Sequence, residues 1–426
     1  MPVAKLFYQN IIWKGVFFLS SFIVTVLIAR HFQASVSGQL FYLVNLYAFI
    51  ILVLSLSLES AMGYFIARNE ISLTRVINFC FAWTLLIAFG IIAFALLKNK
   101  MVFTKTDALA FAFICGNLLS GYGSAIAYAK RNFFLPNIIN TAINIFLIFL
   151  LVFMEAMRPQ IINDDTFMVI FFSIALLQGI ITLLTLNLLY IKSWSLSLPT
   201  VAEGKKLFRY GLVAFAANII SFLLYRVDYW FVKHYCTADD LGNYIQVSKL
   251  AQVFFILPGM LAGAVFPLTA GGQQRGVISI LASVSRVIFV LYLFCCGVLA
   301  ATGYWLFPFI FGHTFQGMYL PFLFLVPGIV ALSTLYTLTA YFAGKNKISV
   351  NIKGALAGLA CIISGDLLLI PLYGINAAAM VSSMGYIVYH IYVLHAFTKE
   401  YGQPAISFFN FSLSDIQKIK RSIFKK

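Results

Sequence analysis

Residues 167–191 read FMVIFFSIALLQGIITLLTLNLLYI and contain no charged side chain. A helix needs about 20 consecutive apolar residues to cross the hydrocarbon core of a bilayer, and this run is long enough. Comparable apolar runs lie at 11–32, 38–60, 76–97, 108–129, 133–154, 209–233, 243–266, 284–307, 319–343, 350–371 and 376–397. The sequence therefore predicts about twelve transmembrane helices.

The composition of the 426-residue chain agrees with a membrane protein. Apolar residues make up 62% and charged residues 10%, whereas a soluble domain has about 45–50% apolar and about 25% charged residues. The runs are apolar on every side and lack the alternating polarity of barrel strands. No polar stretch is long enough for a soluble nucleotide-binding or zinc-finger domain. We therefore predict an all-α integral membrane protein.

The placement of positive charge predicts the topology. The net charge is +16, from 29 Lys and Arg against 13 Asp and Glu. Basic residues are retained on the cytoplasmic side of membrane proteins, so the charge does not require a nucleic-acid partner. With the N-terminus inside, most basic residues fall in inner stretches. The outer stretches hold Arg30, Lys98, Lys100, Lys105, Arg158 and Lys233. We expect both termini in the cytoplasm.

A short repeat divides the chain. Gly15 precedes Arg30 by the same interval at which Gly211 precedes Arg226, and a Gly-amide pair follows each arginine, at 38–39 and 242–243. Many transporters consist of two such halves. We predict six-helix lobes at 1–200 and 201–397, followed by a basic cytoplasmic tail at 398–426.

The tail has two open interpretations. Ser412 and Asp415 have the spacing of a helix-capping box, and apolar residues follow at helical intervals among several lysines. This pattern is typical of a short basic helix lying on the inner membrane face. A disordered tail is the alternative.

Ionisable residues within the apolar runs are the candidate functional residues, because a charge in lipid costs several kcal/mol unless it faces protein or water. Arg30, Arg226 and Lys249 predict a cationic cavity between the halves that receives an anionic ligand. Structural ion pairs and snorkelling side chains are the alternative. The full set is Lys14, Arg30, Glu59, Arg226, Asp228, Lys249, Arg286 and Asp366.

Helical geometry suggests how these charges pair. Arg226 and Asp228 are two residues apart and point about 200° away from each other, so they do not form a pair. Asp228 and Lys249 lie at similar depths in successive predicted helices, which predicts an ion pair between them. By the same reasoning, Lys14 and Glu59 share the inner end of the first two helices.

Other polar residues favour structural roles. His234, His313 and His395 lack metal-ligand spacing with a cysteine or a carboxylate, so no metal site is expected. The acidic pairs at 164–165 and 239–240 lie in short outer loops, where turn acids or helix N-caps are the favoured interpretation. We identify no catalytic constellation, and the chain is not expected to be an enzyme.

Several motifs resemble the Wzx-type polysaccharide flippases of the multidrug/oligosaccharidyl-lipid/polysaccharide (MOP) exporter superfamily. The likeness runs through nearly the whole chain in order and spacing. The motifs are Ala29-Arg30 followed by Gly38, Arg226-Val227-Asp228, Leu241-Gly242-Asn243-Tyr244, Phe266-Pro267, Phe311-Gly312-His313-Thr314-Phe315, Gly344-Lys345-Asn346-Lys347 and Ile370-Pro371-Leu372-Tyr373-Gly374-Ile375-Asn376-Ala377-Ala378.

This resemblance implies a two-lobe carrier with the MOP fold, also found in MATE exporters. Its implied substrate is an undecaprenyl-pyrophosphate-linked oligosaccharide repeat unit for O-antigen, lipopolysaccharide or capsule. The unit would move from the cytoplasmic to the periplasmic leaflet of a bacterial inner membrane. The polymerase and chain-length regulator of the same pathway are possible partners. Coupling to a proton or sodium gradient is also implied, with Asp228, Asp366 and Glu59 as the carboxylates that could carry it.

Two other functions stay open at this point. A membrane polysaccharide polymerase or glycosyltransferase is also many-spanned, but typically carries its catalytic residues on a long outer loop. The first outer connection here, 31–37, is short and contains no acid. A drug or small-molecule exporter of the same fold is the second alternative. Drugs are often cationic and prefer acidic cavities, whereas the predicted core is basic.

Overall fold

The computed structural model describes residues 3–157, 164–191, 197–259, 262, 274–401, 405–415 and 417–418. Every regular element in these ranges is a helix. The chain divides into two compact units, and two stretches of sequence contribute to each. Unit 1 consists of Met1–His31 and Leu43–Ile219, and unit 2 of Phe32–Tyr42 and Ile220–Lys426.

Unit 1 is built around the packing of α4 (Lys105–Ala129) against α6 (Asp164–Tyr190). Two glycines allow this close approach: a Cβ on Gly116 would lie 2.2 Å from the carbonyl oxygen of Ala175, and one on Gly179 would lie 2.3 Å from that of Gly116. Small residues of this kind let helix backbones approach in membranes. The unit also contains most of α1 (Val3–Ser55), α2 (Leu58–Ala67), α3 (Leu73–Lys98), α5 (Phe134–Met157) and most of α7 (Val201–Arg226).

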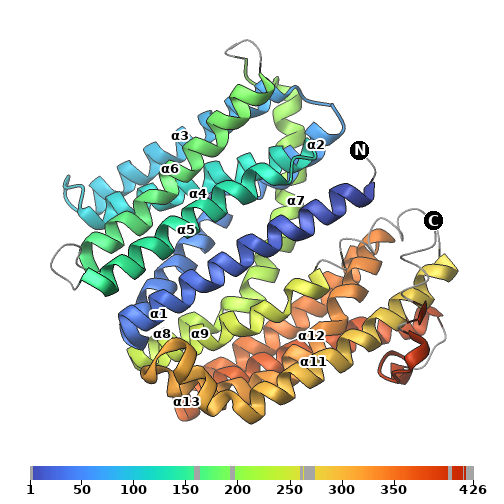
Figure 1. Ribbon diagram of the computed structural model, residues 1–426. Coiled ribbons are helices and arrows are strands. Elements are labelled where there is room, and N and C mark those ends of the chain that lie inside the picture. Colours follow the sequence, from blue (N-terminus) through green and yellow to red (C-terminus); the bar gives the residue numbers. More distant parts are fainter. Residues whose placement is uncertain are drawn as a thin grey trace. The chain divides into compact units, whose positions relative to one another are not determined.

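Unit 2 has its core where α12 packs on α11 and on α13 (Figure 1). Leu332, Leu335 and Leu338 of α12 are almost fully buried there, together with Tyr389 and Phe397 of α13. The elements of this unit are α8 (Asp228–Tyr235), α9 (Ala238–Phe254), α11 (Gln274–Phe311), η1 (His313–Met318), α12 (Tyr319–Gly344), α13 (Ile348–Tyr401) and η2 (Ala405–Phe408).

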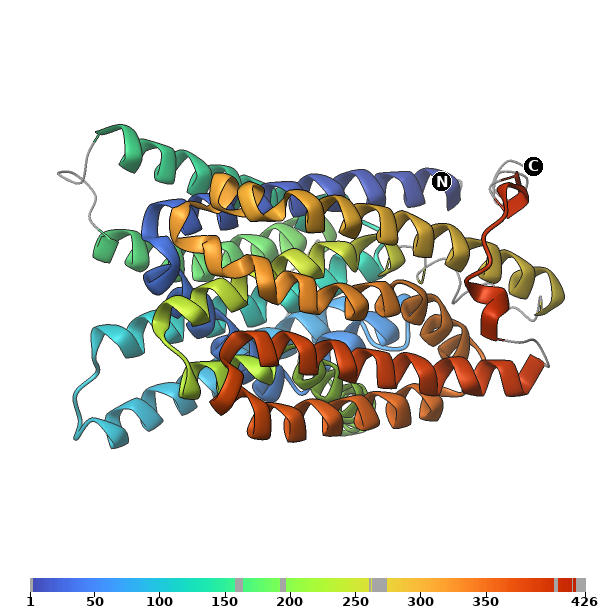
Figure 2. The ribbon, with the colours of Figure 1, turned by 90° about the horizontal axis from the view of Figure 1, so that it is seen from below.

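Two long helices, α1 and α13, each contain one residue whose backbone angles break the helix. Gln33 has φ 59° and ψ −175° within α1, and Gly374 has φ 60° and ψ −145° within α13. In Figure 2 the two halves of α13 run side by side in opposite directions. Their contact is tight, because a Cβ on Gly358 would lie 2.7 Å from the carbonyl oxygen of Gly385. The predicted connections at 33–37 and 372–375 are therefore sharp breaks inside helices.

The two glycines that the sequence repeat treats as equivalent touch each other within unit 2. A Cβ on Gly38 would lie 2.5 Å from the Cα atom of Gly242, and one on Gly242 would lie 1.9 Å from the carbonyl oxygen of Ala34. The amide of Ala34 also donates a hydrogen bond to the Thr314 hydroxyl at 3.1 Å. Residues 32–42 are thus fixed against α9 and η1.

The described residues contain nine helical segments that are long and apolar enough to cross a membrane. Three of them, Ile12–Ser55, Val201–Tyr235 and Ile348–Glu400, have 44, 35 and 53 residues. A single crossing needs about 20 residues, so the first and third have the length for two. The all-α membrane prediction is confirmed, whereas the count of twelve stays a prediction. The end of the predicted eighth span, including Phe266-Pro267, lies outside the described residues.

Candidate functional site

Asp228 is the central acidic residue of a buried polar cluster in unit 2. Val227 separates α7 from α8, and Asp228 is the first residue of α8. Its side chain is 2% exposed. The Oδ2 atom accepts a hydrogen bond from the Tyr244 hydroxyl of α9 and another, at 3.0 Å, from the Ser382 hydroxyl of α13. Three helices therefore converge on one carboxylate oxygen.

The other oxygen of Asp228 and both oxygens of Asp366 have no hydrogen-bond partner among the described protein groups. Asp366 lies in α13 and is completely buried. It is near enough to interact electrostatically with Asp228. Two ionised carboxylates in such surroundings would repel each other and lose their hydration. This arrangement suits two carboxyl groups that share a proton or hold a cation.

Two cationic side chains of unit 2 lie in the same region. Arg226 donates a hydrogen bond from Nη2 to Gln252 Oε1 at 3.2 Å and interacts electrostatically with Asp228. The Lys249 ammonium lies 3.0 Å from the centroid of the Phe41 ring. An aromatic face stabilises a cation when water is excluded. Arg226 also interacts electrostatically with Lys249.

The predicted ion pair between Asp228 and Lys249 is wrong. Tyr244 and Ser382 both donate to Oδ2 of Asp228, the Lys249 ammonium stacks on Phe41 instead, and no ion pair joins Asp228 to Lys249 among the described residues. The depth of a residue along its helix predicts only the axial position of its side chain, not the direction in which it points. Tyr244 and Lys249 are five residues apart on α9 and point about 140° away from each other. The helix presents its tyrosine to the carboxylate, and the lysine consequently lies on another side.

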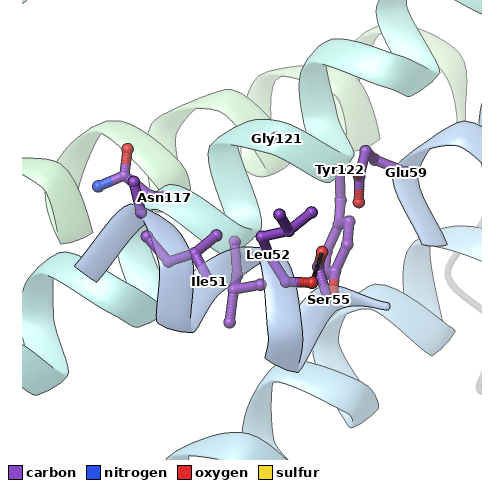
Figure 3. Close-up of a pocket in the computed structure, with 9 residues that line it drawn as sticks. Ile51, Leu52, Ser55, Glu59, Asn117, Gly121 and Tyr122 are labelled. Atoms are coloured by element: carbon purple, nitrogen blue, oxygen red, sulfur yellow. Dashed lines mark hydrogen bonds between the residues drawn. The ribbon is translucent and has the colours of Figure 1, made fainter. Parts of the chain in front are cut away.

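Glu59 lines a separate pocket in unit 1, shown in Figure 3. The pocket has a volume of about 230 Å³. Glu59 and Ser55 lie beside Tyr122 at one end, and Asn117 lies at the other. The complete lining is Ala48, Ile51, Leu52, Ser55, Glu59, Asn117, Leu118, Gly121 and Tyr122.

The pocket exists because the chain breaks between α1 and α2. Leu56 and Ser57 both have left-handed backbone angles, with φ 48° and 51°. The Ser55 hydroxyl accepts a hydrogen bond from the Ser57 amide at 3.1 Å, and Asn218 donates one to the Ser57 hydroxyl at 3.0 Å. This break ends α1 and turns Glu59, in the first turn of α2, toward α4.

The remaining charges of the sequence set have other surroundings. Arg30 is exposed on unit 1, three residues before the break at Gln33. The Lys14 ammonium lies 5.6 Å from the centroid of the Tyr128 ring. No ion pair joins Lys14 to Glu59 among the described residues, so the pairing expected from their shared depth is not formed.

Arg286 holds the C-terminal segment. Its Nε and Nη2 atoms donate to the two oxygens of Asp415 at 2.9 and 2.5 Å, and the Ser283 hydroxyl donates at 2.7 Å. The Ser412 amide also donates to Asp415 at 3.0 Å, as its capping spacing predicts. Phe408 is 1% exposed. Residues 405–415 are therefore docked on unit 2, while most of the predicted basic helix lies outside the described residues.

Tyr244 and Ser382 were missed by sequence reasoning. Tyrosines are frequent in this chain, 22 in all, and Tyr244 looks like another packing residue. The acids at 239–240 were expected to be turn acids or helix N-caps; they lie in the first turn of α9, where Thr237 is the N-cap and Asp240 completes its capping box.

Comparison with known proteins supplies the fold. The chain matches no protein-family model and no curated protein. It is similar to the structure of the lipid II flippase MurJ in an inward closed conformation, with a TM-score of 0.70, 13% identity, and 97% of this chain and 91% of that chain covered. The Vibrio cholerae MATE transporter VcmN gives a TM-score of 0.61 at 14% identity, with 96% and 98% covered.

A third structure is a MOP superfamily transporter from Pyrococcus furiosus. It has a TM-score of 0.57 and 13% identity, with 99% of this chain and 96% of that chain covered. Likeness at this level of identity concerns the fold. The chain is therefore a multi-pass membrane protein with the fold that MurJ shares with transporters of the MOP superfamily.

Proposed function

We propose that this protein moves undecaprenyl-pyrophosphate-linked oligosaccharide repeat units from the cytoplasmic to the periplasmic leaflet of a bacterial inner membrane. The observation that carries the proposal is that two basic residues of unit 2, Arg226 and Lys249, interact electrostatically, while no carboxylate in the described part of the chain pairs with the Lys249 ammonium. The MurJ-like fold and the motifs that resemble Wzx-type flippases support it. Movement is by alternating access through a cationic cavity.

The chemistry of the two cations suits a pyrophosphate. An anion with several oxygens forms charge-assisted hydrogen bonds with a guanidinium, and an ammonium adds a mobile point charge. Lys249 rests on an aromatic face, so it can move to an arriving anion without leaving a buried carboxylate unpaired. Arg30 is proposed as a third contact for the same ligand.

Asp228 and Asp366 are proposed to couple transport to a proton or sodium gradient. The residues fit this role, because three buried carboxylate oxygens lack a hydrogen-bond partner among the described groups. A bound proton or a sodium ion would satisfy them. Glu59, in the pocket of unit 1, is proposed as a further carboxylate for this coupling.

The proposed topology has twelve crossings, in repeat halves at 1–200 and 201–397, with both termini in the cytoplasm. The breaks at Gln33 and Gly374 support it, because each divides a helix that is long enough for two crossings. The polymerase and chain-length regulator of the same pathway are proposed as functional partners.

A strain that lacks this gene tests the function. We expect single lipid-linked repeat units to accumulate on the cytoplasmic leaflet and surface polysaccharide to be lost. Single units on the periplasmic leaflet would indicate a polymerase instead. Normal glycan with altered drug sensitivity would indicate a drug exporter. Either of the last two results would refute the proposal.

A further inference from the structure

We propose that the pocket around Glu59 in unit 1 binds one sugar ring of the transported glycan. This inference rests on the proposed function and assigns part of the substrate to a site separate from the cations of unit 2. It is carried by the pocket's volume, by the polar groups at its two ends and by an unpartnered buried hydroxyl on its wall.

The polar groups of the pocket match the hydroxyls of a sugar. Glu59 offers two acceptor oxygens. Asn117 donates its amide nitrogen to the Phe113 carbonyl at 2.9 Å, which leaves its carbonyl oxygen as an acceptor. Tyr122 adds a hydroxyl that can both donate and accept, whereas the Ser55 hydroxyl already donates to the Leu52 carbonyl and accepts from the Ser57 amide. Carboxylate, amide and hydroxyl groups at opposite ends of a pocket can engage hydroxyls on both sides of one ring.

Tyr122 supplies independent evidence for a polar ligand. Its side chain is 1% exposed, and its hydroxyl has no hydrogen-bond partner among the described groups. A buried hydroxyl without a partner costs free energy, so native structures rarely retain one without a reason. Figure 3 shows this hydroxyl next to Ser55 and below Glu59. A sugar hydroxyl at this end of the pocket would satisfy it.

The size of the pocket argues against both a bare ion and a whole drug-sized ligand. A volume of about 230 Å³ is several times the share of a single water molecule, about 30 Å³. It is also smaller than the sites of about 300–1,000 Å³ that hold drug-sized ligands. The pocket therefore suits one small polar unit better than a bare ion or a whole drug.

The lining also argues against a lipid tail. Ile51, Leu52 and Leu118 make much of the wall apolar, and an acyl chain could contact them. It would, however, leave the Tyr122 hydroxyl without a partner and the Glu59 carboxylate with no contact beyond its local hydrogen bonds, at a cost that hydrocarbon cannot offset. The apolar carbons of a sugar ring can contact the same walls while its hydroxyls meet the polar ends.

Gly121 allows a direct test. It lines the pocket, and a Cβ placed on it has no heavy atom within 4 Å. Gly121→Leu therefore fills the pocket without a clash in the helix packing. Gly90 in α3 is the matched control, because it is also exposed and has equally open space around its Cβ position, but does not line the pocket. Tyr122→Phe removes the unpartnered hydroxyl alone.

The assay compares two ligands on the purified full-length protein in lipid nanodiscs. One is the lipid-linked oligosaccharide extracted from the strain that lacks this gene, and the other is undecaprenyl pyrophosphate without sugar. We expect the wild type and Gly90→Leu to bind the glycosylated lipid about tenfold more tightly, a difference typical of one or two net hydrogen bonds. Gly121→Leu should bind both lipids equally, and Tyr122→Phe should lose part of the preference.

The results separate this inference from the proposed function. If the wild type binds neither lipid, the proposed function fails. If the wild type prefers the glycosylated lipid and Gly121→Leu keeps that preference, the sugar pocket is refuted while the flippase stands. An equal loss of affinity for both lipids in Gly121→Leu would also overturn the inference, because it would show that the pocket does not bind the sugar.

Discussion

Replacing Lys249 with methionine should weaken anion binding and, at the same time, stabilise the fold. Lys249 lies in the apolar run 243–266, which is predicted to cross the membrane, and its ammonium is 3.0 Å from the centroid of the Phe41 ring. Such a contact contributes about 2 kcal/mol when desolvated. A lysine near the centre of a membrane helix costs about 2.5–3.5 kcal/mol. Methionine has a similar length and keeps the contact with the ring without the charge.

The balance favours the variant by about 1 kcal/mol. For a folded unit of this size, that corresponds to a rise in melting temperature of about 2–4 °C. The affinity for undecaprenyl pyrophosphate should fall about tenfold to a hundredfold, because a charge-assisted hydrogen bond is lost. Melting is measured on detergent-solubilised protein, and affinity is measured in nanodiscs.

Lys345→Met is the matched control. The Lys345 ammonium lies 3.1 Å from Glu400 Oε1, and its side chain is 15% exposed. Removing it leaves an acceptor without one of its two lysines, so the melting temperature should fall or stay unchanged, with no effect on affinity. If Lys249→Met lowers the melting temperature as well, the ammonium contributes to stability and the reasoning above is refuted.

Three further predictions concern the acidic pair, the docked tail and the glycine contact. Asp366→Asn should keep the fold but abolish the effect of an imposed proton or sodium gradient on flipping in proteoliposomes; retained coupling would contradict the assignment. The Arg286 guanidinium, together with the Ser283 hydroxyl, lowers the pKa of Asp415 to about 2. Relative to Asp415→Asn, the wild type should therefore gain about 2 kcal/mol of stability above pH 4. That gain should disappear as the pH falls through 2, and equal melting temperatures of the two proteins at pH 7 would count against it. Gly242→Val should reduce folded protein severalfold in size-exclusion chromatography, because its Cβ would lie 1.9 Å from the Ala34 carbonyl oxygen; a normal yield would show that residues 32–42 can move away.

The sequence predicts the helical elements well because lipid imposes a simple rule on them. A charge-free run such as 167–191 is stable in a bilayer only as a helix. In the structure α6 spans Asp164–Tyr190. The acids at 239–240 were also predictable, since an N-terminal turn favours carboxylates. The backbone conformation of the sharp breaks could not be predicted from the sequence. Gln33 adopts φ 59°, and nothing in its residue type requires that conformation.

The site was only partly predictable, because depth along a helix carries no information about rotation. Asp228, Asp366 and Lys249 were identified as buried charges, but their partners depend on which face each helix turns inward. The 140° between Tyr244 and Lys249 on α9 follows from periodicity, but only the structure shows that Tyr244 is the one turned toward Asp228. The pocket of Glu59 depends on the contact between α2 and α4, which links residues far apart in sequence and leaves no local signal.

The most direct test of the central claim is flipping by the purified protein in proteoliposomes. The lipid-linked oligosaccharide from the deletion strain is incorporated, and its access to a membrane-impermeant enzyme that modifies the sugar is followed. We predict that protein-containing vesicles expose the glycan much faster than empty vesicles, and that Arg226→Gln together with Lys249→Met abolishes the difference. Equal exposure with and without the wild-type protein would contradict the proposal that it is a flippase for this lipid.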